Sequence, residues 1–491
     1  MIAILLDGSG PVNQQLYRAM RTAILTAQLK PGEALAPTRV LAKELSVSRN
    51  TILFAYDQLV AEGYAVTRQG AGTFVVDKVP IDGFASRKRE PLRVPAKEPA
   101  LGHLNLPDLE IPQSQVNRAL RFNFKYGEPA FADLPLETWA RLVGRRARTF
   151  TERQLSYPSP GGAIELRQAL SAYLFSARGV ICQAEQVIIL QGTQQGIDLT
   201  ARLMVKKGSK VVVEEPQYRG LVASMKFAGA DLHYVPVDHE GLIVDQLEKI
   251  GNSRLVCCTP SHQFPSGGVL PLTRRLKLLA WAEKNDAMVL EDDYDGEFRY
   301  ESRPIPSLQS LDTEGRVLYL GTASKILFPS LRLGWLVVPP SWVSSFQAVK
   351  SISDRGCSML EQLALADFIS EGHLARHIHR IRKRHARRRA VLLAEVENQL
   401  GHRAVSVGTQ AGIHVLLRVL TLPGSLTEQM LQECRDVDVG VYSSQPYYQN
   451  PPDNIELIMG YASLDENAIP EAVKRIALVI NKLEKANLNN G

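Results

Sequence analysis

Short apolar runs recur along the C-terminal three quarters of the chain, separated by stretches with helical spacing. The runs are Val187–Leu190, Val211–Val213, Leu255–Cys258, Met288–Leu290 and Val317–Leu320. None of them alternates apolar with polar residues, so each predicts a strand that is buried on both faces. Such strands, when they alternate with helices, form a mostly parallel sheet covered by helices on both sides. An α/β fold is therefore predicted for residues 116–485.

The first part of the chain has a different pattern, which predicts a small winged helix-turn-helix unit over residues 10–78. Apolar residues at helical spacing predict a helix over residues 12–29, and Thr38 and Ser48 are placed to cap a second and a third helix. Gly63 ends the third helix. Two β-rich runs joined by a glycine-containing turn follow, over residues 64–67 and 73–76.

The third helix of this unit begins with side chains that suit DNA. Its first turn faces away from the apolar core, and in a recognition helix that turn reaches base edges in the major groove. Arginine forks onto guanine, and asparagine pairs with adenine. The alternative is a helix-turn-helix that serves only for dimerisation or protein contact. The predicted DNA-contacting residues of the helices and the wing are Arg39, Ser48, Arg49, Asn50, Thr51, Arg68, Gln69 and Gly70.

Residues 79–115 differ in composition from both flanking parts. They hold six prolines and the basic cluster Arg87–Arg89, and they contain few apolar residues that a core would bury. A proline-rich segment of this kind predicts a semi-extended linker between two domains.

Composition excludes several classes of protein. The five cysteines form an odd set without C-x-x-C spacing, which fits neither a disulfide framework nor a zinc site and suits a reducing cytosol. His373, His377 and His379 have no carboxylate or cysteine beside them, so no metal site is predicted. No apolar stretch is long enough to span a bilayer. We expect a cytoplasmic protein with no membrane partner.

Residues suited to pyridoxal 5′-phosphate (PLP) follow several of the predicted strands. This aldehyde cofactor needs an amine, an anion beside its ring nitrogen, a phosphate cradle and a flat neighbour. Lys325 offers the amine, Asp292 the anion and Tyr218 the flat ring, and Tyr294 could bond the ring hydroxyl. A helix that begins after Gly192 offers backbone N–H groups to phosphate. The predicted cofactor-binding residues are Thr193, Gln194, Tyr218, Asp292, Tyr294, Thr322, Ser324, Lys325 and Arg332.

Each of these signals is weak alone, and the acidic run Glu291–Asp295 by itself would predict a solvated loop. Their combination over residues 120–485 resembles fold-type I aminotransferases, and Pro37 to Val75 resembles the winged-helix domain of GntR-type bacterial regulators. Both halves in this order resemble the MocR group of GntR-type regulators, which shares the phrases T-P-S-H-Q-F-P-S-G (259–267) and E-D-D-Y-D (291–295). This resemblance implies a head-to-tail homodimer, Lys325 as the Schiff-base residue, and ligand-dependent control of transcription from a double-stranded DNA operator.

The chain departs from the pattern of these relatives at positions that concern the ligand. Phe264 stands where aminotransferases carry an asparagine near the ring hydroxyl, which leaves His262 or Gln263 as a substitute. Members that sense GABA have an arginine two residues after the stacking tyrosine, where this chain has Gly220. Residues 442–447 also lack the arginine that those members use for the effector carboxylate. The predicted effector is therefore another small amino compound, or PLP itself.

Two functions follow from these observations. The first is a PLP-dependent transcriptional regulator that senses its ligand through an aminotransferase-like domain. The alternative is a catalytically active aminotransferase with an appended DNA-binding head, because Lys325, Asp292 and Tyr294 are the groups that such chemistry needs. Whether the chain is an enzyme stays open on sequence alone, and non-enzymatic sensing is the preferred reading.

Overall fold

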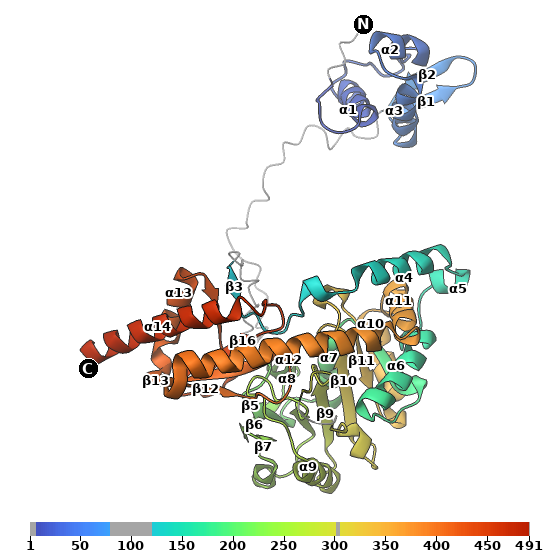
Figure 1. Cartoon of the computed structure of the whole chain (residues 1–491). Helices are drawn as coiled ribbons and strands as arrows, with labels where there is room; N and C mark the ends of the chain where they lie inside the picture. Colours follow the sequence, from blue (N-terminus) through green and yellow to red (C-terminus); the bar gives the residue numbers. More distant parts are fainter. Residues whose placement is uncertain (1–5, 79–119, 301–304, 491) are drawn as a thin grey trace, which may run out of the picture. The chain divides into compact units, whose positions relative to one another are not determined.

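The computed structural model describes residues 6–78, 120–300 and 305–490 (Figure 1). The chain divides into two compact units, one N-terminal and one C-terminal. The predicted linker over residues 79–115 lies outside the described residues. Each unit is therefore described by itself.

The N-terminal unit has three helices followed by an antiparallel hairpin. Its elements are α1 (Val12–Leu25), α2 (Thr38–Glu44), α3 (Arg49–Ala61), β1 (Ala65–Arg68) and β2 (Gly72–Val75). The core contains Leu16 and Met20 of α1 together with Ile52 and Leu59 of α3, all less than 3% exposed. The predicted winged helix-turn-helix is confirmed.

Two local predictions for this unit are wrong. The first helix ends at Leu25 and not at residue 29, because the chain turns at Ala27 (φ +56°) and the N–H of Leu29 bonds back to the Ala23 carbonyl. Thr38 does not cap α2: Pro37 holds the cap position, and the side chain of Thr38 makes no capping bond. The Pro37 carbonyl already accepts the N–H groups of Val40 and Leu41, so the fixed φ of proline starts this helix.

Ser48 caps α3 as predicted, since its hydroxyl accepts the N–H of Thr51 at 3.1 Å. Replacing Ser48 by alanine is expected to lower the stability of a fragment covering residues 6–78 by about 1 kcal/mol, because one helical N–H then loses its acceptor. Thermal or urea unfolding of the fragment measures this. Ser48→Gly is the matched control, because glycine is tolerated at this position at a cost of a few tenths of a kcal/mol. An equal loss of stability in Ser48→Ala and Ser48→Gly contradicts the capping role of the Ser48 hydroxyl.

The C-terminal unit is built on an eight-stranded sheet with the order β4-β11-β10-β9-β8-β5-β6-β7. Six of these strands run in one direction, and β11 and β7 run antiparallel to the strands beside them. The strands are β4 (Val187–Leu190), β5 (Lys210–Glu215), β6 (Asp231–Asp238), β7 (Gly241–Leu242), β8 (Leu255–Cys258), β9 (Met288–Asp293), β10 (Val317–Thr322) and β11 (Gly334–Val337). The predicted mostly parallel α/β sheet is confirmed.

Helices cover both faces of this sheet because successive strand residues point in opposite directions. In β4, Ile188 and Leu190 pack with α7, α8 and α10, whereas Val187 and Ile189 pack with α4, α6 and α11. The short helix α5 follows α4. Helix α9 packs in one cluster with side chains of the strands β5 to β10. These helices are α4 (Leu136–Arg148), α5 (Glu152–Leu155), α6 (Ile164–Arg178), α7 (Thr193–Met204), α8 (Arg219–Phe227), α9 (Leu272–Lys284), α10 (Val343–Ser353) and α11 (Met359–Ser370).

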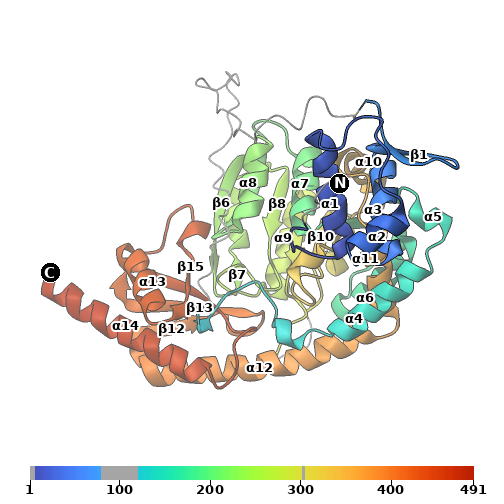
Figure 2. The same ribbon diagram turned by 90° about the horizontal axis from the view of Figure 1, so that it is seen from above.

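A second, smaller sheet with the order β12-β13-β16-β15 completes the unit. The long helix α12 runs from the side of α4 and α6 to the side of α13 and α14 in both views (Figures 1 and 2). The two-residue strands β3 and β14 pair separately. These elements are β3 (Phe122–Asn123), α12 (His373–Leu400), β12 (Ala404–Val407), β13 (His414–Pro423), α13 (Thr427–Asp436), β14 (Val439–Gly440), β15 (Tyr442–Ser443), β16 (Asn454–Gly460) and α14 (Ile469–Asn490).

The acidic run Glu291–Asp295 is not a solvated loop. Glu291, Asp292 and Asp293 belong to β9, and all three are less than 9% exposed. Asp292 and Thr322 therefore lie within the ends of their strands and not after them. Among the described helices, none combines the length and the apolar character that crossing a bilayer requires.

Candidate functional site

The predicted cofactor residues gather at the carboxyl ends of β4, β5, β9 and β10. These four strands are parallel, so their carboxyl ends lie along one edge of the sheet, where ligands bind in α/β folds. Lys325 follows β10, Asp292 is the last residue but one of β9, and Tyr218 follows β5 and precedes α8. The edge thus carries an amine, a carboxylate and an aromatic ring.

The side chain of Lys325 is hydrogen-bonded to a backbone carbonyl near the start of the C-terminal unit. Its Nζ donates a hydrogen bond to the Gly127 carbonyl at 2.7 Å, across 198 positions in sequence. Burial lowers the pKa of Lys325, while the charges of Asp295 and Asp292 oppose that shift. A lysine with a lowered pKa spends more time as the neutral amine, which is the form that attacks a carbonyl carbon.

Asp292 carries a buried oxygen without a hydrogen-bond partner among the described residues, its Oδ1. The next residue, Asp293, is paired instead with Arg178 at 2.7 Å and accepts the hydroxyl of Tyr319. Burial and the charge of Asp293 raise the pKa of Asp292 to about 7. A buried carboxylate oxygen of this kind suits the N–H of a ligand such as a pyridinium ring, which would restore the missing bond.

The start of α7 forms a narrow cradle with Arg332. Gly192 caps the helix at φ +82°, and a Cβ there would lie 2.6 Å from Arg332 Nη2, which donates to the Gln191 carbonyl. A Cβ at Gly334 of β11 would lie 3.2 Å from the Thr193 nitrogen. Any side chain at either glycine would therefore crowd this space. A helix N-terminus beside an arginine has the chemistry of a phosphate site.

Three other predicted residues line or support this cradle. Thr322 and Ser324 are buried, and the Ser324 N–H donates to the Thr322 hydroxyl at 3.1 Å. The Gln194 amide donates to the Gly220 carbonyl and to Ser224 of α8, both at 2.9 Å, while its buried Oε1 has no partner among the described residues. The side-chain amide of Gln194 is thus committed to α8 in this structure.

Aromatic side chains that the sequence analysis did not select surround the site. Phe264 packs edge-on against Tyr447 at 4.9 Å and against Tyr218 at 6.5 Å, and it also contacts Tyr126 at 5.9 Å. Tyr126 and Tyr447 bond each other through their hydroxyls. Tyr126 and Gly127 lie before the first helix of the unit and Tyr447 lies near its last strand. Only tertiary contacts bring them together, so no local pattern could have identified them.

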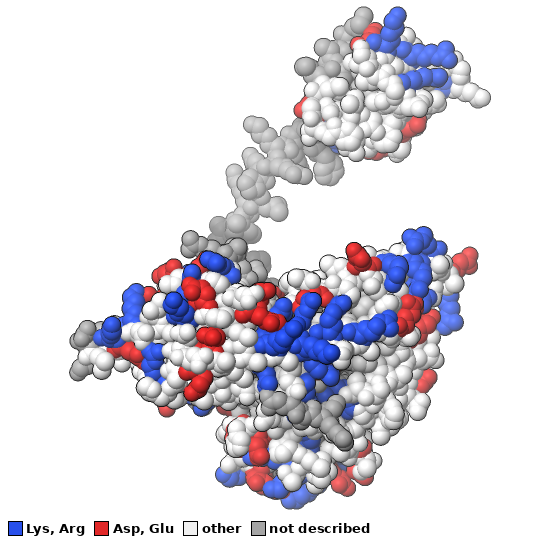
Figure 3. All heavy atoms as spheres, viewed as in Figure 1, with Lys and Arg blue, Asp and Glu red and all other residues white. Residues whose placement is uncertain are grey.

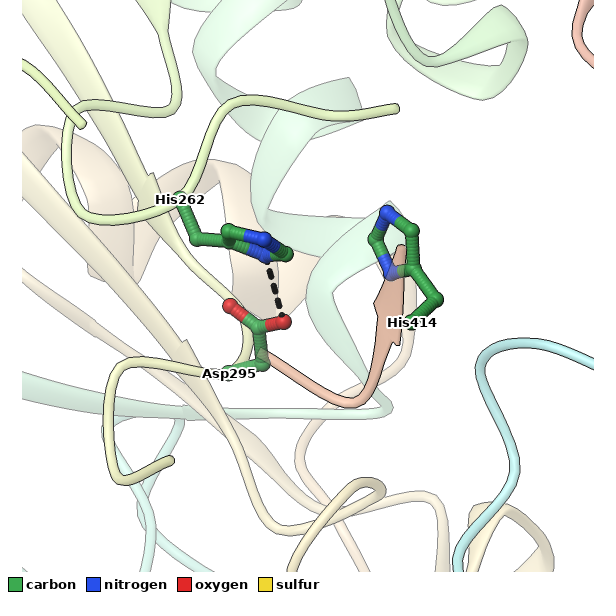
Figure 4. Close-up of side chains that lie close together, drawn as sticks. All are labelled: His262, Asp295 and His414. Carbon is green, nitrogen blue, oxygen red and sulfur yellow. Dashed lines mark hydrogen bonds and ion pairs between the residues drawn. The ribbon is translucent and has the colours of Figure 1, made fainter. Parts of the chain in front are cut away.

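The structure distinguishes between His262 and Gln263 as the neighbour of Tyr294. His262 Nδ1 lies 3.0 Å from the Tyr294 hydroxyl, and 2.9 Å from Asp295 Oδ2 (Figure 4). The Gln263 amide instead donates to the Pro216 and Phe264 carbonyls. His262 therefore contacts Tyr294, the residue predicted to bond the ring hydroxyl of PLP. The side chain of Gln263 forms hydrogen bonds with backbone carbonyls near its own loop.

In the N-terminal unit, the predicted DNA-contacting residues are solvent-accessible. Arg39, Ser48, Arg49, Asn50, Arg68, Gln69 and Gly70 are exposed, and Thr51 is half-buried. Arg49 Nε lies 3.3 Å from the Thr38 hydroxyl, and the Arg68 guanidinium stacks 4.7 Å from the Phe74 ring centre. Figure 3 shows basic side chains gathered on the side of this unit that carries α2 and the wing. The unit thus presents one basic face.

The raised pKa of Asp292 predicts a pH dependence for the cofactor-free protein. Between its ordinary value of 3.8 and about 7, the folded state holds a proton that the unfolded chain has lost, so stability falls as pH rises through that window. Asp292→Asn is expected to flatten this decline in the thermal midpoint measured from pH 4 to pH 8. Asp453→Asn, at an exposed carboxyl, is the control and should keep the wild-type slope. An unchanged slope in Asp292→Asn contradicts the assignment.

A winged helix-turn-helix joined to a lysine-bearing aminotransferase fold defines a class of bacterial transcription regulators. Two family models match the chain: bacterial regulatory proteins of the gntR family over residues 12–75, and aminotransferase class I and II over residues 122–476. The chain belongs to the GntR family of helix-turn-helix regulators, in the MocR group that carries an aminotransferase-like domain.

Relatives of known name extend over nearly the whole chain. It is 36% identical to the probable rhizopine catabolism regulatory protein MocR of Rhizobium meliloti, over 99% of this chain and 97% of that protein. It is 31% identical to the pyridoxine biosynthesis transcriptional regulator PdxR of Corynebacterium glutamicum, over 93% of both. Among solved structures, the kynurenine aminotransferase of Pyrococcus horikoshii matches with a TM-score of 0.68 and 28% identity, over 74% of this chain and 91% of that one.

Proposed function

We propose that this regulator binds PLP at Lys325 and senses an amino compound, or PLP itself, through its aminotransferase-like domain. The observation that carries the proposal is the buried, unpartnered Oδ1 of Asp292 on the same sheet edge as the Lys325 amine. The proposed cofactor residues are the nine predicted from the sequence. When bound, PLP supplies an aldehyde that joins amines reversibly and a ring that withdraws electrons.

The residues around Lys325 divide the work of holding such a cofactor. Asp292 is suited to retain a proton on the ring nitrogen, and Tyr294 to donate to the ring oxygen. Thr193, Ser324 and Arg332 are suited to the phosphate, and Tyr218 to one face of the ring. The Gln194 amide would have to leave its bonds to Gly220 and Ser224 to reach a phosphate, so its part in the cradle requires a local rearrangement.

We further propose that the N-terminal unit contacts operator DNA through the eight residues predicted from the sequence. The exposed Arg49 and Asn50 at the start of α3 and the basic wing support this assignment. Residues 10–78 and 116–485 are the proposed domains, with residues 79–115 as their linker. A homodimer would place two such heads on two half-sites. Tyr157 and Ile352, which are 81% and 83% exposed and line one hollow, support a contact between two copies.

The ligand is proposed as a small amino compound or as PLP. The relative named as a pyridoxine biosynthesis regulator favours PLP, while the relative named for rhizopine catabolism favours a different compound. In either case the ligand must have different affinities for the DNA-bound and the DNA-free arrangement of the protein. Equal affinities would leave the equilibrium between the two arrangements unchanged.

Two measurements on the purified chain test the proposal. Added PLP should produce a visible absorption band, and borohydride reduction should leave an adduct on the peptide that contains Lys325. Operator affinity, measured with and without PLP and a panel of amino compounds, should change by about 5- to 150-fold with the true ligand. A colourless protein without the adduct removes the cofactor claim, and an operator affinity indifferent to every compound removes the sensing claim.

An active aminotransferase with a DNA-binding head is the second candidate, because Lys325, Asp292 and Tyr294 are all present at one edge. A steady-state assay against amino acids and 2-oxo acids separates the two functions. Many turnovers per subunit favour the enzyme, and spectral change without turnover favours the sensor.

A further inference from the structure

Three buried polar side chains meet beside Tyr294. His262 comes from the loop after β8, Asp295 from the loop after β9, and His414 from the start of β13 in the smaller sheet (Figure 4). Each is 1% exposed, and one ligating atom from each lies within 4.8 Å of the others. The proposed function assigns no role to this group.

The same three residues have the composition of a metal site, but their bonds describe a different arrangement. His262 and Asp295 bond each other directly at 2.9 Å. His414 Nε2 contacts the Pro265 carbonyl at 3.2 Å, which requires a proton on that nitrogen, and burial holds the pKa of His414 well below its usual range. The two imidazole rings therefore use different partners, His262 the Asp295 carboxyl group and His414 the Pro265 carbonyl.

The position of the proton on His262 follows from its surroundings. Its Nε2 is buried and has no partner among the described residues, whereas its Nδ1 faces both Asp295 and Tyr294. A proton on Nε2 would leave a buried donor without an acceptor, which costs more than leaving a buried acceptor unused. The proton accordingly resides on Nδ1, where the Asp295 carboxylate accepts it.

This tautomer determines what Tyr294 can do. The Nδ1–H is shared between the Asp295 carboxylate at 2.9 Å and the Tyr294 oxygen at 3.0 Å. The phenol therefore accepts from His262, and its own proton is available to Asp295 or to a bound ligand. Burial and the charge of Asp295 raise the pKa of Tyr294 well above its usual value, which keeps that proton on the phenol. Tyr294 is thereby prepared as a donor.

We propose that Asp295 and His262 form a positioning pair that directs the Tyr294 hydroxyl proton toward the ring oxygen of bound PLP. This inference rests on the proposed cofactor site. It also explains the presence of Phe264. Aminotransferases carry an asparagine at this position, which is a second donor to that oxygen. This chain has a phenylalanine there and depends on Tyr294, whose hydroxyl is oriented by His262. Neither Asp295 nor His262 needs to contact the cofactor.

The loop before β13 packs closely against His262 and Asp295. A Cβ at Gly412 (φ +82°) would lie 2.1 Å from His262 Cε1 and 2.7 Å from Asp295 Oδ2. The Gly412 carbonyl is in turn held by the hydroxyls of Tyr300 and Tyr461, at 2.7 and 2.6 Å. The smaller sheet therefore sets the distance between His262 and Asp295.

The test is the pH titration of the visible band of the PLP-loaded, full-length protein. A donor to the ring oxygen favours the deprotonated form of the bound cofactor, so its loss moves the midpoint to higher pH. We expect His262→Phe to raise the midpoint by roughly half to one pH unit, the effect of one hydrogen bond. The other ionisable groups that act on Tyr294 or on the Lys325 amine are Asp292, Glu214, His414, Glu128 and Arg332. All of them are unchanged in the variant.

A double-mutant cycle identifies the route of the effect. Tyr294→Phe should raise the midpoint at least as far, and adding His262→Phe to it should cause no further change, because His262 acts through Tyr294. His385→Phe is the matched control. It makes the same exchange at a buried histidine that packs on Phe298 at 5.1 Å, and it should leave the midpoint unchanged.

The outcomes separate this inference from the proposed function. A wild-type protein without a visible band overturns both. A wild-type band whose midpoint is the same in His262→Phe, or two shifts that simply add in the double variant, overturn the positioning pair alone. If His262→Phe does not fold, His262→Ala decides, since it removes the same ring without adding bulk and leaves the charge of Asp295 in place. An upward shift supports the pair, and an unchanged midpoint overturns it.

Discussion

Replacing Lys325 by alanine is expected to abolish covalent capture of PLP. The amine is the one group of the site that forms a bond with the aldehyde, so neither the adduct after borohydride reduction nor the visible band should survive in the variant. The change removes a partly buried amine whose hydrogen bond among the described residues is to the Gly127 carbonyl, and the fold should therefore persist. Absorbance spectra and peptide mass measurement of reduced samples check this expectation.

Lys226→Ala serves as the control, because Lys226 is an exposed lysine in the last turn of α8. It should capture PLP as the wild type does. Operator binding by Lys325→Ala should remain, since the N-terminal unit is intact, while its response to the ligand should disappear. A variant that responds normally contradicts sensing through Lys325 and leaves the aminotransferase-like domain as a scaffold.

Replacing Arg49 by alanine is expected to have the second-largest effect, on DNA. Arg49 is exposed in the first turn of α3 and lies against Thr38 of α2, so its guanidinium is already oriented at the end of the recognition helix. Losing a bidentate contact to a base costs about 1–3 kcal/mol, or roughly 5- to 150-fold in specific affinity. Fluorescence anisotropy with the upstream region of a regulated gene, against a scrambled duplex, measures it.

The control for this experiment is Arg18→Ala. Arg18 is a half-buried arginine on α1 that pairs with Asp7 at 2.8 Å. Its removal changes the charge of the unit equally but should leave specificity unchanged. If Arg49→Ala weakens the specific and the scrambled duplex by the same factor, Arg49 contacts phosphate and not a base.

Local patterns were sufficient for much of the fold. The runs at Val187–Leu190 and Leu255–Cys258 coincide with β4 and β8, because a strand that is apolar on both faces contrasts with every neighbouring segment. Ser48 was recognisable as a cap because its hydroxyl acts on an N–H only three residues away. The predicted cap at Thr38 is wrong because Pro37, the residue before it, starts the helix without a side-chain hydrogen bond.

The cofactor site was partly predictable for the same reason. Lys325 and Asp292 each follow or end a recognisable strand, so topology alone brings them to one edge. Gly127, His414 and Tyr447 reach that edge through contacts between distant segments, and nothing in their own neighbourhoods marks them. The partner of Tyr294 could be narrowed to His262 or Gln263, but choosing between them required the direction in which each side chain leaves its loop.

The hydrogen bond from Lys325 to the Gly127 carbonyl joins the reactive amine to the entrance of its own domain. Only residues 120–126 separate Gly127 from the stretch that leads back to the winged unit. A ligand that draws the amine toward Asp292 would release that carbonyl, so occupancy at the sheet edge would be felt first by the backbone nearest the DNA-reading half. Under the proposed function, a change at the Lys325 amine would thus reach the first residues of the domain through one hydrogen bond, without passing through the sheet.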